Sequence, residues 1–135
     1  MTSPAVLLDT HAWAWALTAS ARLSPRAIAC LSDAEAVFVS PISFFEIGQK
    51  IRLRKWPQME PFAARLPDLL REQGGQTAAL TAPICLEAAL LDWACRDPFD
   101  RILAATALAL GLPLVSTDVV FDELAGDARW RGRLW

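Results

Sequence analysis

The stretch of sequence that decides the fold is RDPFDRILAATALALGLPLVSTD, residues 96–118. Asp97 with the proline after it is a typical helix start, because the carboxylate accepts a hydrogen bond from the first turn and proline fits the first helical position. The apolar residues that follow predict a buried helix, and Gly111 predicts its end. Residues 114–116 then form a short apolar strand just before Asp118. A buried helix that leads into a buried strand is typical of α/β proteins.

Outside this stretch, short apolar runs alternate with longer helical patterns. The alternation predicts a three-layer α/β/α domain with a central, mainly parallel sheet, and we expect residues 1–135 to form one domain. The predicted strands are 5–8, 36–40, 77–80 and 114–116, with an edge strand within 129–135. The other predicted helices are 10–17 capped by Thr10, one opened by Ser24 and Pro25, one capped by Ser43, 61–73 interrupted by Pro67, and one from Thr81 toward Asp92.

Composition limits the possible classes of function. The chain has 135 residues, 54% of them hydrophobic, which suits a folded domain with a sizeable core. Its three cysteines, never spaced as CxxC, favour buried thiols in a reducing compartment, so we expect a cytoplasmic protein without a disulfide framework. We expect neither a membrane span nor a signal peptide. A net charge of -2 means that any nucleic acid is held by a local basic patch.

Acidic residues follow the predicted strands. Asp9 and Asp118 each come after an apolar strand, and Asp97 and Asp100 open the helix of the quoted stretch. Because ligands bind beyond the carboxyl ends of parallel strands, these distant acids can converge there, with Glu46 as a further member. Clustered carboxylates repel one another unless a cation is present, and Mg²⁺ or Mn²⁺ is the natural cation for oxygen ligands. The sequence therefore predicts an acid-lined site.

Each acid also has a purely structural interpretation. Helix capping alone explains Asp97, and Asp9 and Asp118 fit ordinary loops after strands. Glu46 has mostly apolar neighbours, and Lys50 one helical turn later offers it a simple ion pair.

Four motifs together resemble a known family. They are LLDTHAWAWAL (7–17), VSPISFFEIGQKIRLRKW (39–56), RDPFDRILAATALALGLPLVSTD (96–118) and the closing RLW. In order and spacing they resemble the PIN-domain ribonucleases of the VapC toxin family over almost the whole chain. The resemblance implies a Mg²⁺- or Mn²⁺-dependent endoribonuclease, the toxin of a type II toxin-antitoxin system. It also implies RNA as the substrate, a cognate antitoxin as the partner and a homodimer.

The resemblance assigns roles by motif position. The metal-binding and catalytic acids of the family fall on Asp9, Glu46, Asp100 and Asp118, and Asp97 is an accessory acid beside them. The implied mechanism is hydrolysis of the phosphodiester bond, with the acids holding one or two divalent ions that activate water and stabilise the leaving oxygen. Relatives often carry a histidine where this chain has Cys95, a change that we expect to alter substrate contacts without abolishing catalysis.

Residues beside the acids have two interpretations each. The hydroxyls of Thr10 and Thr117 either orient a water or a carboxylate, or serve in caps and turns. His11, the only histidine of the chain, is favoured as a packing or hydrogen-bonding residue over a general base. We expect Trp13 and Trp15 to make core or dimer contacts rather than to stack on bases.

Two groups of basic residues, one within the motif of residues 39–56 and one near the end of the sequence, are candidates for holding RNA phosphates. A solvated helix face and a charge-guarded edge strand explain them equally well. The candidates are Lys50, Arg52, Arg54 and Lys55 in one run, and Arg129, Arg131 and Arg133 near the end.

Two other functions compete with the nuclease. One is a PIN-fold module that binds RNA or an antitoxin without cutting, if the acids fail to assemble. The other is a phosphatase with Asp9 as nucleophile, which fits poorly because such enzymes carry a second aspartate two positions on, where this chain has His11.

Overall fold

A sheet of five parallel strands forms the centre of the computed structural model, which describes residues 4–135. The order across the sheet is β3-β2-β1-β4-β5, so the chain extends the sheet from β1 to one side and then returns to extend it to the other. The strand order therefore reverses between β1 and β4. The strands are β1 (Val6–Leu8), β2 (Val37–Val39), β3 (Gln76–Thr77), β4 (Leu114–Val115) and β5 (Arg133–Leu134).

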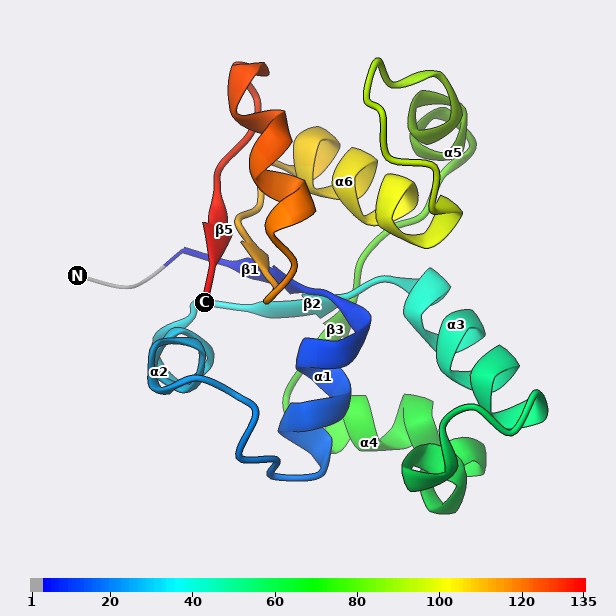
Figure 1. The fold of residues 1–135 in the computed structure, drawn as a ribbon. Coiled ribbons are helices and arrows are strands. Elements are labelled where there is room, and N and C mark those ends of the chain that lie inside the picture. The colour runs from blue at the N-terminus through cyan, green and yellow to red at the C-terminus, as the bar shows by residue number, and fades with distance from the viewer. Residues whose placement is uncertain (1–3) are drawn as a thin grey trace.

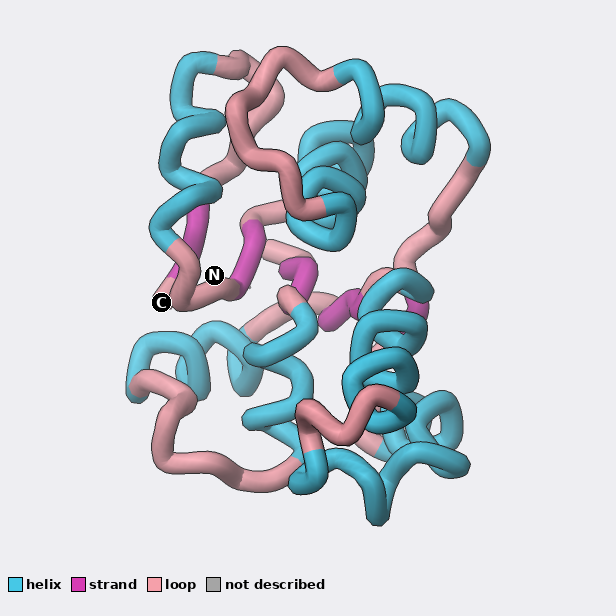
Figure 2. Tube along the Cα trace, turned by 45° about the vertical axis from the view of Figure 1, so that its right-hand side comes forward, coloured by secondary structure: helices cyan, strands magenta, loops and turns pink. Residues whose placement is uncertain are grey.

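Helices cover both faces of this sheet. The α-helices are α1 (Thr10–Leu17), α2 (Pro25–Asp33), α3 (Pro41–Arg52), α4 (Leu66–Glu72), α5 (Ala82–Leu90) and α6 (Pro98–Leu110), and the 3-10 helices are η1 (Pro57–Arg65) and η2 (Val119–Gly126). On one side lie α1, α2 and α4, and on the other lie α6 and η2 (Figure 1), with the strands as a layer between them (Figure 2). The predicted three-layer α/β/α architecture is thus confirmed. Within residues 4–135, no helix has the length and apolar character that a membrane crossing requires.

The central strand β1 contributes to two separate cores. Val6 and Leu8 pack on the side of α1, together with the fully buried Trp13. Leu7 points the opposite way and packs with Leu103 of α6. Alternate side chains of a strand face opposite sides of the sheet, so burial of both faces explains why this strand is apolar without interruption.

Two predicted helix caps are wrong. Asp9, not Thr10, caps α1, and its carboxylate accepts a hydrogen bond from the Ala12 N–H at 2.8 Å. Ser40, not Ser43, caps α3, so this helix begins earlier than predicted. Thr10 and Ser43 bond to each other instead of capping their helices. The Thr10 hydroxyl donates a hydrogen bond to the Ser43 hydroxyl oxygen at 2.9 Å, which joins α1 to α3.

Other boundaries follow the sequence more closely. Gly111 ends α6 in the left-handed conformation, with φ of 66°, which glycine adopts without steric cost. The segment predicted as one helix interrupted by Pro67 is divided into η1 and α4, with Pro67 in the first turn of α4, and the predicted edge strand is present as β5. The strand predicted over 77–80 is displaced and shorter, because only Gln76–Thr77 pairs with β2.

One side chain holds the segment between α5 and α6. The Arg101 guanidinium donates hydrogen bonds to the carbonyl oxygens of Ala88 and Trp93 at 2.8 Å each and of Cys95 at 2.7 Å. It donates a further hydrogen bond to the carbonyl oxygen of Leu91. Because this segment leads directly into α6, Arg101 fixes the position at which that helix begins.

We expect Arg101→Lys to lower the free energy of unfolding by about 2 kcal/mol, because hydrogen bonds from a charged donor contribute roughly 1.5–3 kcal/mol and an ammonium cannot replace the guanidinium fork. Urea unfolding followed by circular dichroism measures the change. Arg96→Lys is the control, since Arg96 is an exposed neighbour in the same motif. An equal loss in both variants would contradict the role given to Arg101.

Candidate active site

The predicted acids come from elements that meet where the strand order reverses. Asp9 directly follows β1, and Asp118 follows the neighbouring strand β4 after a two-residue turn. Glu46 is carried by α3 and Asp100 by the first turn of α6, and α3 contacts both α1 and α6. This edge, beyond the carboxyl ends of β1 and β4, is the usual ligand position of an open parallel sheet.

Asp9 is a buried carboxyl group, only 7% exposed. Its pKa is raised to about 6, mainly by burial, and the charges of Glu46 and Asp118 add to the shift. Hydrogen bonding from Ser116 and from the Ala12 backbone N–H opposes it. Burial and like charges together therefore disfavour the ionised form of Asp9.

Asp100 experiences the charges of all the other predicted acids. Burial is the largest cause that raises its pKa, to about 7, followed by the charges of Asp97, Asp118, Glu46 and Asp9. The structure thus brings Asp9, Glu46, Asp97 and Asp118 close enough to Asp100 for their charges to act on it. This mutual repulsion is unfavourable unless a cation shares the site.

Glu46 is buried, 8% exposed, but it has a basic partner. Its Oε2 lies 3.0 Å from Lys50 Nζ, as the helical spacing predicts. The ion pair with Lys50, which the structural interpretation of Glu46 predicts, is therefore present. It does not remove Glu46 from the acidic group, because the charge of Glu46 still raises the pKa of Asp9 and of Asp100.

The donor chemistry of these acids fits a hard divalent cation. In the described part of the chain, the groups that shift the pKa of Asp9 are acids, a serine and a backbone N–H, with no basic side chain among them. Oxygen donors of this kind suit Mg²⁺ or Mn²⁺. No three Asp, Glu, His or Cys side chains within residues 4–135 are already grouped as a metal site. The acids therefore share an electrostatic field without forming a closed ligand set.

The accessory residues have definite places in the structure. Asp97 caps α6 and accepts a hydrogen bond from the Phe99 N–H at 2.9 Å, in agreement with its structural interpretation. The Thr10 hydroxyl is used by the bond to α3, whereas Thr117 is exposed next to Asp118. Cys95 Sγ lies 4.0 Å from an oxygen of Asp100, so the residue that replaces the expected histidine directly adjoins an acid.

The aromatic candidates are packed to different degrees, and several of the basic candidates are paired with acids. Trp13 is a core residue, as expected, but Trp15 is only half-buried. His11 packs against an aromatic ring, since it stacks on Trp56 with centroids 4.8 Å apart, and burial lowers its pKa. Arg129 bonds to Asp127 and Glu87, Arg133 to Asp122 and Lys50 to Glu46, whereas the side chains of Arg52, Arg54, Lys55 and Arg131 are exposed.

Sequence reasoning missed Ser116 and Arg101, although both lie inside quoted motifs. The Ser116 hydroxyl oxygen accepts a hydrogen bond from the Asp118 N–H at 3.0 Å, and the same side chain lowers the pKa of Asp9. Ser116 is completely buried and so links the two acids that follow β1 and β4. A polar residue at the end of a buried strand was the available signal in the sequence.

In chelating buffer at neutral pH, we expect Asp100→Asn to be more thermostable than the wild type. Because the pKa of Asp100 is raised to about 7, the folded state binds more protons than the unfolded state above pH 3.8, so this group's contribution to stability falls as the pH rises toward 7. For a half-buried acid the gain is on the order of 1 kcal/mol, about 3–5 °C in Tm, and it disappears near pH 4. Thermal scans at both pH values measure it.

The control for this prediction is Asp122→Asn. A hydrogen bond from Arg133 holds the pKa of Asp122 below its usual value, so neutralising Asp122 lowers the Tm at neutral pH instead of raising it. An Asp100→Asn gain of equal size at pH 4 and at neutral pH would contradict repulsion as its cause.

Comparison with known proteins agrees with this architecture. The fold is similar to VapBC2 from Rickettsia felis bound to a DNA fragment from its promoter, with 12% identity, a TM-score of 0.64, and coverage of 97% of this chain and 99% of that chain. It is also similar to FitAB bound to an IR36 DNA fragment, with 18% identity, a TM-score of 0.55, and coverage of 87% and 90%. At these identities the likeness concerns the fold alone.

The family is established by the sequence itself. No curated protein matches the chain significantly. The sequence profile of the PIN domain, however, matches residues 6–127, which include all the acids described above. The chain therefore belongs to the PIN domain family.

Proposed function

We propose that this protein is a divalent-metal-dependent endoribonuclease and the toxin of a type II toxin-antitoxin system. One observation supports the proposal: burial raises the pKa of Asp9 and of Asp100, and the charges of the other predicted acids, which come from separate segments, add to both shifts. Repulsion among the acids destabilises the metal-free protein, and a bound cation relieves it, so the binding of a cation is favoured. Membership of the PIN domain family supports the proposal, because PIN domains are generally nucleases.

The acids have distinct positions for the proposed reaction. Asp9, Glu46, Asp100 and Asp118 are the proposed cation ligands, and Asp97 keeps the first turn of α6 in place through its cap. Mg²⁺ or Mn²⁺ bound there supplies Lewis-acid charge and an activated water for phosphodiester hydrolysis. Thr117 is exposed beside Asp118, and its hydroxyl is the proposed accessory group that would orient a water or a carboxylate there. Ser116 and Arg101 are proposed positioning residues, because Ser116 accepts a hydrogen bond from the Asp118 N–H and Arg101 holds the segment that leads into α6.

The proposed substrate is RNA in the cytoplasm. The basic run at the end of α3 supplies the positive charge that a chain of net charge -2 needs in order to hold a polyanion. Three of its side chains are exposed and the fourth is the partner of Glu46, so the run adjoins the acids. These residues are Lys50, Arg52, Arg54 and Lys55.

The proposed partners are an antitoxin and a second copy of the chain. The similar structures VapBC2 and FitAB are toxin-antitoxin complexes, which supports the antitoxin. Exposed apolar side chains support a protein interface, among them Phe45 at 59% and Leu90 at 74% exposure. An antitoxin that places an Arg or Lys side chain among the acids would neutralise them as a metal does, and so would block cleavage.

We expect the purified protein to cut single-stranded RNA with Mg²⁺ or Mn²⁺ and not in excess chelator. Asp9→Asn and Asp100→Asn each lower the rate at least about 100-fold, because they remove a proposed ligand. Asn also keeps the cap of α1, so Asp9→Asn stays folded. Gel analysis of end-labelled RNA measures cleavage, and Asp68→Asn is the control because Asp68 is exposed on α4, outside the acids.

Full activity in chelator would overturn the metal-dependent mechanism. RNA binding without cleavage under any divalent metal would establish the non-catalytic alternative. Loss of activity in Asp68→Asn as large as in Asp100→Asn would show that the assay reports folding and not the acids.

We expect a homodimer by light scattering at micromolar concentration, and inhibition of cleavage by the product of an adjacent small gene. Apolar residues exposed on α3 and α5 supply the contact area that this association needs. A monomer at all concentrations, with cleavage unaffected by that product, would contradict both parts.

A further inference from the structure

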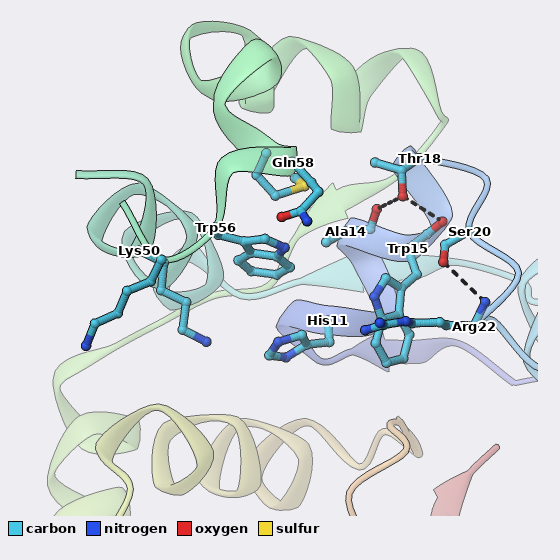
Figure 3. Close-up of a pocket in the computed structure, with 11 residues that line it drawn as sticks. His11, Ala14, Trp15, Thr18, Ser20, Arg22, Lys50, Trp56 and Gln58 are labelled. Carbon is cyan, nitrogen blue, oxygen red and sulfur yellow. Dashed lines mark hydrogen bonds between the residues drawn. The ribbon is translucent and has the colours of Figure 1, made fainter. Parts of the chain in front are cut away.

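A cavity of about 590 Å³ lies between α1, the loop that follows it, the end of α3 and η1 (Figure 3). Six of the side chains around it are aromatic or basic: His11, Trp15, Arg22, Lys50, Lys55 and Trp56. Neither the basic run of the sequence nor its tryptophan pattern predicts this combination, because the residues come from two separate segments, 11–22 and 50–59.

The charge of the cavity differs in sign from that of the whole chain. Arg22, Lys50 and Lys55 line it, and no Asp or Glu is among the residues that do. The chain as a whole carries a net charge of -2. The cavity is therefore a local positive site of the kind that attracts phosphate groups.

The aromatic rings form one connected group. His11 stacks on Trp56 with an interplanar angle of 30° and is tilted against Trp15 at a centroid distance of 5.7 Å. All three rings are half-buried, so each still presents surface to the cavity. Lys50 and Arg22 lie over the rings of Trp56 and Trp15 at 5.3 and 6.0 Å. Figure 3 shows the three rings around the hollow, with Lys50 and Arg22 on opposite sides of it.

Two residues connect this cavity to the acids. Lys50 reaches the ring of Trp56 and also pairs with Glu46 at 3.0 Å. His11 lies in the first turn of α1, two residues after Asp9. A chain of nucleotides that passes over the acids therefore meets the cavity within a short distance.

We propose that this cavity binds one nucleotide of the RNA substrate, with its base against the rings of Trp15 and Trp56 and its phosphates at Arg22 and Lys55. The inference rests on the proposed nuclease function and adds to it the place where the strand is held. A nucleotide offers both a flat π surface and negative charge, which are the two properties that aromatic rings with basic neighbours recognise. A peptide of aliphatic residues offers neither of them.

The first test measures binding of a fluorescein-labelled single-stranded RNA hexamer by anisotropy, in chelator, so that cleavage plays no part. We expect the double variant Arg22→Gln, Lys55→Gln to bind at least about tenfold more weakly, and the dependence of log K on log salt to flatten by about 1.4, since each phosphate contact contributes about 0.7 for a single strand. The matched control is Arg26→Gln, Arg65→Gln, which removes two charges of exposed arginines outside the cavity.

The second test examines the base. We expect Trp56→Leu to weaken binding of the hexamer about tenfold and Trp56→Phe to restore most of it, because stacking depends on the aromatic surface. A hexamer with abasic sites should bind Trp56→Leu and the wild type equally. Thermal scans check that each variant is folded. If Trp56→Leu is unfolded, the exposed pair Arg22 and Lys55 still decides the proposal.

The outcomes separate this site from the nuclease itself. Binding that depends on Arg22 and Lys55 in a protein that never cuts RNA would refute the nuclease and support the cavity. Cleavage with an unchanged KM in the Arg22, Lys55 variant, or an equal loss of binding in the matched control, would overturn the cavity site. Unchanged RNA binding in all variants would also overturn it and leave the cavity to a protein partner.

Discussion

Burial of carboxyl groups within range of other acids, at the reversal of the strand order, is the constraint on which the rest of this structure depends. Burial raises the pKa of Asp9 to about 6, and the charges of Glu46 and Asp118 add to the shift. A fold can keep such a group only if packing elsewhere compensates for it. The two cores on either face of β1, and the carbonyl groups gathered by Arg101, hold the acids where their own charges would separate them.

Helix capping reduces the cost of this arrangement. Asp9 begins α1, Asp97 begins α6 and Asp118 begins η2, and each carboxylate accepts a hydrogen bond from a backbone N–H of the first turn. Such bonds favour the charged form, as does the positive end of a helix. Capping and membership of the acidic group are therefore not competing interpretations of these residues. The cap fixes each carboxylate in one position, and from these positions the charges of Asp9, Asp97 and Asp118 all raise the pKa of Asp100.

Features with a local signal were predictable from the sequence. The start and end of α6 follow from Asp97 and Gly111, and β1 and β4 from short apolar runs, so the edge at which the acids meet was predictable too. Features that depend on contacts between distant segments were not. The cap of α3 was misplaced because Ser43 is used by Thr10, which lies 33 residues away in sequence. The hydrogen bonds of Arg101 and the walls of the cavity depend on tertiary packing in the same way.

Lys50 shows how one residue can serve both parts of the site. A protein that binds a polyanion at a group of acids must bring positive charge close to those acids without neutralising them completely. Lys50 is one turn after Glu46 on α3, so its ammonium group pairs with that carboxylate at 3.0 Å. The same group lies 5.3 Å from the ring of Trp56, at the wall of the cavity. The acidic group and the basic cavity are therefore separated by a single turn of α3, because Glu46 and Lys50 are four residues apart in the sequence.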